Sequence, residues 1–186
     1  MQKRSSLIII GGKWRSRKID FLPLETVRPT TNPIRETVFN WLAPIIADAN
    51  CLDLFAGSGA LGFEALSRGA KSVLFIDKSI KIISLLKENA RALNAKNADF
   101  LCALIPRDLL KIPKQTFDIV FLDPPFKQNL LHPCCELLRE NNYIGQGSYI
   151  YLEAEKSLNI QEVIPKDWQI VKSKITGEVG YYLITI

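Results

Sequence analysis

The sequence predicts an α/β fold with a mostly parallel sheet, helices on both faces and an antiparallel hairpin at the C-terminal end. Between residues 51 and 152, short apolar runs alternate with segments of helical periodicity, as in strands joined by crossover helices. The last two apolar runs, 168–174 and 181–186, are separated only by a turn and should pair antiparallel. The length of 186 residues suits one domain over 1–186, of which 1–32 form a basic β-hairpin extension.

The N-terminal part predicts a hairpin followed by a helix. Apolar runs at 7–10 and 18–22 flank a glycine pair, which is typical of a strand, a turn and a return strand. Asn32 suits the N-cap of a helix and Pro33 its first position. Apolar residues then recur at helical spacing, and Pro44 should bend or shorten this helix near its end.

The central part predicts alternating strands and helices. Gly69 is placed to end the first of these helices and Ser79 to cap the second. We predict strands at 51–55, 73–76, 98–102, 117–122 and 148–152, with helices at 60–68, 80–93 and 130–138.

Composition is that of a globular protein, with 47% hydrophobic and 23% charged residues. No segment approaches the roughly 18 uninterrupted apolar residues of a membrane span, and the run 7–10 is too short for a signal-peptide core. The four cysteines show no C-x-x-C spacing and no grouping with the single histidine, His132, which we expect to be structural or exposed. We therefore expect a cytoplasmic protein with no membrane contact, no disulfide framework and no metal.

Positive charge is concentrated at the N-terminus. Residues 1–40 hold eight lysines and arginines against three acids, whereas the remaining chain holds 16 of each. Trp14 lies within the cationic run 13–18. Cations interleaved with an aromatic residue suit a nucleic acid, because phosphates attract the charge and bases can stack on the ring. A solvated basic tail is the alternative, and we favour nucleic-acid contact.

A glycine-rich loop follows the strand at 51–55. Gly57, Gly59 and Gly62 match G-x-G-x-x-G, and Asp77 ends the next strand at the spacing from which an acid reaches a ribose diol. Glycine lets a ligand approach the backbone, and the free N–H groups at the helix start can hold a negative group. The loop fits a dinucleotide, or another nucleoside with an acidic tail such as S-adenosylmethionine. A tight turn that uses glycine only for packing is the less favoured alternative.

The tetrapeptide Asp123-Pro124-Pro125-Phe126 follows the buried strand at 117–122. Two prolines cannot extend a central strand, so the chain leaves the sheet at the carboxyl end, where ligands bind in open α/β folds. A carboxylate, a rigid carbonyl and an aromatic ring at this point suit a planar substrate with an NH2 group. A simple proline turn is the alternative.

The order of these motifs resembles that of the S-adenosylmethionine-dependent amino-methyltransferases. Three N-terminal blocks narrow the resemblance to bacterial enzymes that methylate a guanine N2 of 16S ribosomal RNA in the small ribosomal subunit. These blocks are 9–15 (IIGGKWR), 28–31 (RPTT) and 35–42 (RETVFNWL).

The resemblance implies a seven-stranded Rossmann-like methyltransferase fold, S-adenosylmethionine as donor and S-adenosylhomocysteine as product. The expected partner is 16S ribosomal RNA, within a small subunit or its assembly intermediate, and the protein is expected to be a monomer. The implied catalytic residues are Asp123, Pro124, Pro125 and Phe126; the cofactor residues are Asp53, Phe55, Gly57, Ser58, Gly59, Asp77 and Lys78; the RNA-binding residues are Lys13, Trp14, Arg15, Arg17, Arg28 and Arg35. The residue that contacts the cofactor adenine is not assigned.

In this hypothesis Asp123 and the Pro124 carbonyl accept the two amine hydrogens, and Phe126 stacks on the base. Asp123 then takes the proton released after methyl transfer. Glu153 and Glu155 share one face of a strand end, where a solvated edge is favoured over a place in the cofactor pocket. Three other functions stay open: a DNA adenine-N6 methyltransferase, an NAD-dependent oxidoreductase and a non-catalytic RNA-binding module.

Overall fold

The computed structural model describes residues 4–23 and 30–186, and it confirms the predicted α/β architecture. A small sheet pairs two N-terminal strands, and a large sheet contains seven. The strands are β1 (Ser5–Ile8), β2 (Lys18–Phe21), β3 (Asn50–Asp53), β4 (Ser72–Asp77), β5 (Ala98–Cys102), β6 (Ile119–Leu122), β7 (Tyr149–Glu155), β8 (Gln169–Thr176) and β9 (Val179–Thr185). The helices are α1 (Asn32–Leu42), α2 (Ala60–Ser67), α3 (Ile80–Leu93) and α4 (Leu131–Glu140), with 3-10 turns η1 (Gly12–Trp14), η2 (Leu109–Lys111) and η3 (Ile160–Glu162).

The large sheet has the strand order β5-β4-β3-β6-β7-β9-β8. Neighbouring strands from β5 to β7 run parallel, and β9 pairs antiparallel with both β7 and β8. The predicted terminal hairpin is therefore confirmed. The parallel strands place their carboxyl ends along one edge of the sheet, where the predicted site residues lie.

Helix boundaries follow local signals in the sequence. The Ser79 hydroxyl accepts a hydrogen bond from the Ile82 amide, so Ser79 caps α3 as predicted. Helix α1 ends at Leu42, before Pro44, as the missing proline N–H requires. Its N-cap is Thr31 rather than the predicted Asn32, a shift of one residue.

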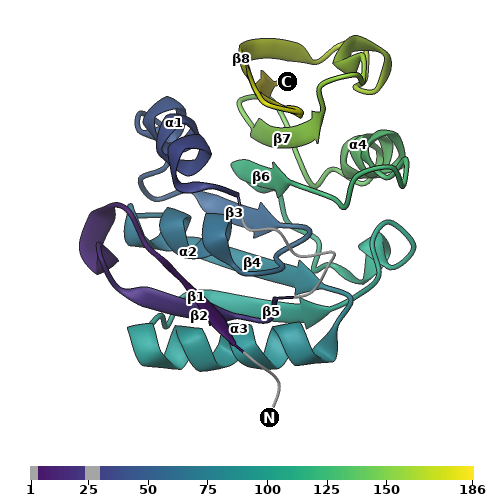
Figure 1. Cartoon of the computed structure of the whole chain (residues 1–186). Coiled ribbons are helices and arrows are strands. Elements are labelled where there is room, and N and C mark those ends of the chain that lie inside the picture. The colour runs from purple at the N-terminus through teal and green to yellow at the C-terminus, as the bar shows by residue number, and fades with distance from the viewer. Residues whose placement is uncertain (1–3, 24–29) are drawn as a thin grey trace.

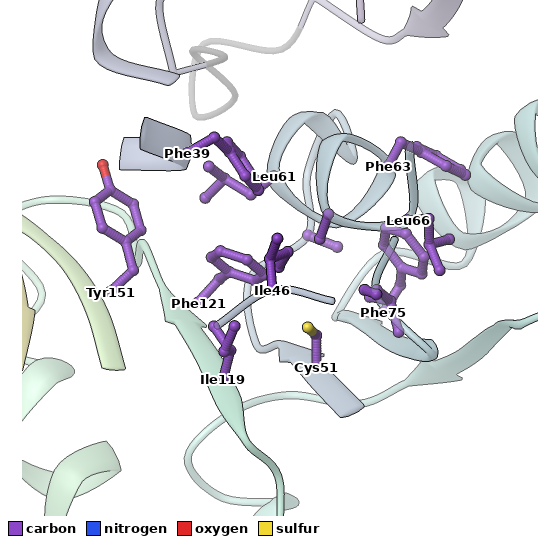
Figure 2. Packing of buried hydrophobic residues seen from close by; sticks show 14 of the residues in the cluster. Phe39, Ile46, Cys51, Leu61, Phe63, Leu66, Phe75, Ile119, Phe121 and Tyr151 are labelled. Carbon is purple, nitrogen blue, oxygen red and sulfur yellow. The ribbon is translucent and has the colours of Figure 1, made fainter. Parts of the chain in front are cut away.

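Two apolar clusters cover the two faces of the sheet, and Figure 1 shows helices on both sides of it. Helices α1, α2 and α3 pack on one face, and α4, η2 and η3 pack on the other. Aromatic rings fill the first layer: Phe63 and Phe75 lie 4.8 Å apart between ring centroids, and Phe39 and Phe121 lie 6.0 Å apart (Figure 2). This burial of apolar surface is the main force that fixes the sheet and its loops.

The β1–β2 hairpin packs on the face that carries α2 and α3 (Figure 1). Ile9 and Ile19 are only 1% exposed and belong to the same apolar cluster as α2 and α3. The Asn89 side chain of α3 bonds both the amide and the carbonyl of Asp20. The hairpin is thus fixed to the large sheet through its helices rather than being a loose tail.

Buried charges attach the segment after β1 to α2. Glu64 accepts hydrogen bonds from the Ile10 amide at 2.9 Å and from Arg68 Nε at 2.7 Å. Arg35 Nη1 lies 3.6 Å from the same carboxylate, and both side chains are fully buried. Gly12 has a φ of +72°, and an added Cβ would lie 1.9 Å from the Ser67 carbonyl oxygen, so no other residue fits there. We call Arg35, Glu64 and Arg68 the anchoring cluster.

No helix within residues 4–23 and 30–186 has the length and apolar character that crossing a membrane requires.

Candidate active site

Four carboxylates gather where adjacent parallel strands end. Asp53 ends β3, Asp77 ends β4, Asp123 follows β6 and Glu153 lies in β7. Because β4, β3, β6 and β7 are neighbours in this order, their ends meet at one edge of the sheet. We call these four residues the carboxylate cluster.

The glycine loop joins β3 to α2 and contacts Asp77. The Gly57 amide donates to Asp77 Oδ2 at 3.1 Å, and the Ser79 amide donates to Asp77 Oδ1 at 2.8 Å. Gly59 has a φ of +77°, and an added Cβ would lie 2.6 Å from a Leu86 methyl carbon, so packing also requires glycine there. The structure brings the predicted loop and the predicted acid together.

Asp53 lies beneath this loop and is 3% exposed. Its carboxylate accepts a hydrogen bond from the Gly62 amide at 3.2 Å. Burial raises the pKa of Asp53 to about 7 despite that bond, because loss of water disfavours the charged form. Burial also raises the pKa of Asp77, while its two backbone bonds act in the opposite direction.

The other predicted cofactor residues surround the same loop. Ser58 is buried, and its hydroxyl accepts a hydrogen bond from the Ala60 amide at the start of α2. Phe55 is half-buried in the turn after β3, and Lys78 is exposed beside Asp77. The sequence left the adenine contact open; the structure places two exposed apolar residues, Ile80 and Leu104, just after the adjacent ends of β4 and β5.

The carboxylate cluster forms no ion pair within the described chain, although the charge of the adjacent Lys78 opposes the rise in the pKa of Asp77. No lysine or arginine in residues 4–23 or 30–186 forms an ion pair with any of its four members. Buried carboxylates without a cation favour a ligand that supplies an ammonium group and hydroxyl donors. An amino acid joined to a nucleoside meets both needs, so the residues present fit S-adenosylmethionine. Among the described residues, no three or more His, Cys, Asp or Glu side chains are arranged so that they could hold a metal ion.

The tetrapeptide leaves the sheet after β6 as predicted. Asp123 is half-buried, Pro124 is buried, and the Phe126 side chain is 39% exposed and open to a stacking partner. Burial and the neighbouring charge of Glu153 raise the pKa of Asp123 well above its usual range. Sequence reasoning thus placed all four residues of the tetrapeptide at this edge.

Glu153 is a residue that the sequence analysis assigned wrongly. It is 5% exposed rather than on a solvated edge, because β7 is an interior strand between β6 and β9. Its Oε1 accepts from the Tyr151 hydroxyl at 2.6 Å and from the Thr30 hydroxyl at 3.0 Å. The available signal was its place within the run YIYLEAE, where apolar residues continue on both sides.

A cavity of about 250 Å³ opens beside the tetrapeptide. It is lined by Phe126 and the two prolines, by Leu158 and Val163, and by Glu153 and Glu155 at the end of β7. Glu155 Oε1 accepts the Lys127 amide at 2.6 Å and so fixes the chain after the tetrapeptide. His132 also lines this cavity, with Nδ1 2.9 Å from the Val163 carbonyl, a contact that supports a structural role.

The predicted RNA-binding residues separate into two groups. Lys13, Arg15 and Arg17 are exposed on the hairpin side of the molecule. Trp14 is only 7% exposed, with Lys13 Nζ 4.2 Å from its ring centroid, so its ring is packed and not open to a base.

Arg35 requires a second correction. Its side chain is fully buried in the anchoring cluster and donates to the Ile8 carbonyl, so it cannot reach RNA from this position. Arg28 lies outside the described residues. The sequence could not distinguish a buried arginine from exposed ones, because net charge carries no information on side-chain direction.

Comparison with known proteins gives one family and a consistent set of relatives. The family described as Conserved hypothetical protein 95 matches residues 7–185. Ribosomal RNA small subunit methyltransferase D of Haemophilus influenzae is 44% identical over 178 residues, covering 94% of this chain and 91% of that protein. The protein of the same name from Buchnera aphidicola (strain APS) is 40% identical, covering 98% of this chain and 94% of that protein. The one from Escherichia coli K12 is 42% identical, covering 94% of this chain and 87% of that protein.

Solved structures also superpose on this chain over nearly its whole length. The yhhF protein of Escherichia coli superposes with a TM-score of 0.86 at 40% identity, covering 97% of this chain and 98% of that one. A Thermus thermophilus 16S rRNA N2 G1207 methyltransferase, solved with AdoMet and guanosine, superposes with a TM-score of 0.74 over 98% of this chain and 50% of that one. At 19% identity the second likeness establishes the fold alone.

Proposed function

We propose a function from the premise that this chain belongs to the family described as Conserved hypothetical protein 95, together with the ribosomal RNA small subunit methyltransferases D. The proposed function is methylation of a guanine N2 in 16S ribosomal RNA. The methyl donor is S-adenosylmethionine. The observation that carries the proposal is the carboxylate cluster, which joins a glycine loop suited to a nucleoside with a tetrapeptide suited to a planar amine.

The cofactor is held by the glycine loop side of the cluster. Asp77 accepts the ribose hydroxyls, since its carboxylate stands at the end of β4 beside the Gly57 amide. Asp53 accepts the ammonium group of the methionine part, which favours its charged form. Ile80 and Leu104, 67% and 39% exposed, contact the faces of the adenine ring, an apolar role that explains their exposure. Phe55, Ser58 and Lys78 complete this set.

The target base is held by the tetrapeptide side. Phe126 stacks on the guanine, and the cavity beside it receives the ring. Asp123 and the Pro124 carbonyl each accept one amine hydrogen. When bound, the cofactor supplies an electrophilic methyl group on a sulfonium centre. Two fixed acceptors orient the nitrogen lone pair and need no reorganisation during the reaction. Such a pocket requires a base that is unpaired or flipped out of its stack.

The exposed hairpin cations contact the RNA backbone. Lys13, Arg15 and Arg17 supply charge for phosphates, and Arg28 is retained as a proposed contact. We propose that residues 1–32 form the basic extension of a single domain, and that the substrate is a small ribosomal subunit or its assembly intermediate. We also propose that the protein acts as a monomer in the cytoplasm, without a membrane or a metal.

The test is incorporation of a labelled methyl group into three substrates: small ribosomal subunits, purified 16S ribosomal RNA and duplex DNA. We expect incorporation into ribosomal RNA as N2-methylguanine, identified by mass spectrometry of digested nucleosides. Duplex DNA is included because the tetrapeptide alone suits any planar amine. Transfer to adenine in DNA would contradict the proposal. Calorimetry adds a second arm: we expect binding of S-adenosylhomocysteine and not of NAD. Binding of NAD instead would favour an oxidoreductase, and RNA affinity without cofactor binding would favour a non-catalytic module.

A further inference from the structure

Thr30 lies between two carboxylates of the cluster. Its hydroxyl oxygen is 3.0 Å from Glu153 Oε1 and 3.5 Å from Asp123 Oδ2. A threonine hydroxyl has one hydrogen to donate and lone pairs to accept. It therefore cannot donate to both carboxylates at once. Both contacts are satisfied together only if one carboxyl is protonated and donates to the Thr30 oxygen.

The surroundings decide which carboxyl holds that proton at rest. Glu153 Oε1 accepts hydrogen bonds from the Tyr151 hydroxyl at 2.6 Å and from the Thr30 hydroxyl, so two donors stabilise the charged form of Glu153. Asp123 has only the longer Thr30 contact among the described side chains. The arrangement that satisfies every group is Asp123–H donating to Thr30 while Thr30 donates to a charged Glu153.

This resting arrangement conflicts with the role proposed for Asp123. A protonated carboxyl that donates its hydrogen to Thr30 is a weaker acceptor for an amine N–H than a carboxylate is. The proton must leave Asp123 when the amine arrives. The Thr30 hydroxyl provides a path: it takes the proton from Asp123 and gives its own hydrogen to Glu153, so that no atom other than hydrogen moves far.

We infer that Glu153 and Thr30 form a proton relay that keeps Asp123 charged when the amine is bound. Glu153 is a positioning residue in this scheme, because it acts on the amine through Asp123. The inference rests on the proposed function and deepens it by naming where the proton goes.

The sequence of events balances in atoms and charge. Binding of the amine moves one proton from Asp123 through Thr30 to Glu153. The amine nitrogen then uses its lone pair to form the N–C bond, while the methyl–sulfur bond breaks and its electron pair stays on sulfur. The nitrogen, now cationic, gives one hydrogen to the Asp123 carboxylate. One proton leaves the Asp123–Glu153 pair for solvent as the products depart, which restores the resting state.

The ionisable groups around the relay favour a shared proton. Asp53 faces Asp123 from β3, Tyr151 shares the face of β7 with Glu153, and Tyr181 of β9 stands opposite Glu153 in the strand register. None of these groups is a cation, and no described lysine or arginine pairs with Asp123 or Glu153. Burial raises the pKa of both carboxyl groups, which favours a proton held between them over two charged carboxylates.

The test is the pH dependence of kcat/KM for ribosomal RNA in four variants. Glu153→Gln removes the second proton site and its charge, so the acidic limb of the profile should move to lower pH by about one to two units. The matched control is Glu178→Gln, which removes an exposed carboxylate from the β8–β9 turn and should leave the profile unchanged.

Thr30→Val and Thr30→Ser separate the relay from packing. Valine keeps the shape but not the hydroxyl, so kcat should fall by about tenfold or more. Serine keeps the hydroxyl and should restore most of the rate. The Thr30 variants test the relay even if Glu153→Gln does not fold. Binding of S-adenosylhomocysteine will report whether Glu153→Gln is folded.

The outcomes separate the relay from the proposed function. An unshifted profile in Glu153→Gln, or equal rates in the valine and serine variants, would overturn the relay while methyl transfer itself stands. No transfer to ribosomal RNA by the unaltered protein would overturn the proposed function, and the relay with it.

Discussion

The molecule contains two buried groups of charges that differ in how they are neutralised. The anchoring cluster pairs Glu64 with Arg35 and Arg68, at 3.6 and 2.7 Å. The carboxylate cluster places acids at four neighbouring strand ends with no described cation in contact. Both clusters lose contact with water, yet within the described residues only the first contains ion pairs, whereas the acids of the second have hydrogen bonds alone. Under the proposed function, the paired charge holds the fold and the acids without an ion pair receive a ligand.

The pairing within the anchoring cluster is itself incomplete. Arg35 Nη1 and Nε have no hydrogen-bond partner among the described residues, and burial lowers the pKa of Arg35 while Glu64 acts against that shift. Glu64 also accepts the Ile10 amide and so connects three segments: α1, α2 and the turn after β1. Loss of Glu64 would therefore leave a buried guanidinium without its partner and an amide without its acceptor.

The largest effect we expect is from Glu64→Gln. Removing the charge leaves Arg35 buried and uncompensated, so the free energy of unfolding should fall by about 3–5 kcal/mol. Chemical denaturation measures this change. The control is Glu88→Gln, which breaks the exposed pair with Arg4 and should cost at most about 1 kcal/mol. Equal costs for the two variants would contradict the view that the anchoring cluster stabilises the fold.

Asp123→Ala tests the carboxylate cluster, in which the acids have no ion pair among the described residues. Methyl transfer should fall by at least about 10²–10³-fold, because an acceptor for the amine hydrogens is lost. Thermal stability should be kept or improved, since the variant removes a half-buried carboxyl that has no ion pair among the described residues. Affinity for S-adenosylhomocysteine should persist. Asp167→Ala, which removes an exposed acid, is the control for the rate measurement. Near-normal turnover of Asp123→Ala would refute the assigned role.

Asp77→Ala should act on the cofactor and not on the RNA. Loss of hydrogen bonds to a charged acceptor should weaken S-adenosylhomocysteine by about 10- to 100-fold. Calorimetry measures this affinity, and Asp99→Ala on the exposed face of β5 provides the control. The assignment of Asp77 to the ribose would be wrong if binding were unchanged.

The raised pKa of Asp53, about 7, predicts a pH dependence of cofactor binding. Only the charged form attracts an ammonium group, so affinity for S-adenosylhomocysteine should rise about tenfold from pH 6 to pH 8. Asp53→Asn should flatten that rise. The sign for stability is opposite: the folded state binds this proton more tightly than the unfolded chain, so the contribution of Asp53 to stability falls as pH rises from about 4 to about 7. A flat affinity profile in the unaltered protein would contradict the assignment.

The smallest effect concerns the hairpin that the anchoring cluster holds in place. Arg15→Ala and Arg17→Ala should each weaken RNA binding by less than about tenfold and reduce its salt dependence by about one charge. Thermal stability should not change for Arg15→Ala, whose side chain is exposed, and should fall slightly for Arg17→Ala, because Arg17 Nη2 donates to the Ala92 carbonyl at 2.9 Å. Filter binding at several salt concentrations measures the effect. Lys172→Ala and Lys174→Ala, on the exposed β8, provide charge-matched controls, and equal losses there would argue against a defined RNA surface on the hairpin.

The sequence by itself determined the fold class, the glycine loop with Asp77 and the tetrapeptide after β6. These features depend on local spacing: apolar periodicity sets the element type, and glycine and proline restrict the backbone wherever they occur. The charge excess of residues 1–40 was equally visible, but not its division between surface and interior.

Only the tertiary structure decided which of those charged and aromatic residues are buried. It placed Arg35 and Trp14 in the interior while Arg15 and Arg17 stay exposed. It also brought Thr30 to Asp123 and Glu153, residues that stand 93 and 123 positions further along the chain. Contacts between residues so far apart in the chain depend on the order of the strands in the sheet, and local residue spacing does not predict that order.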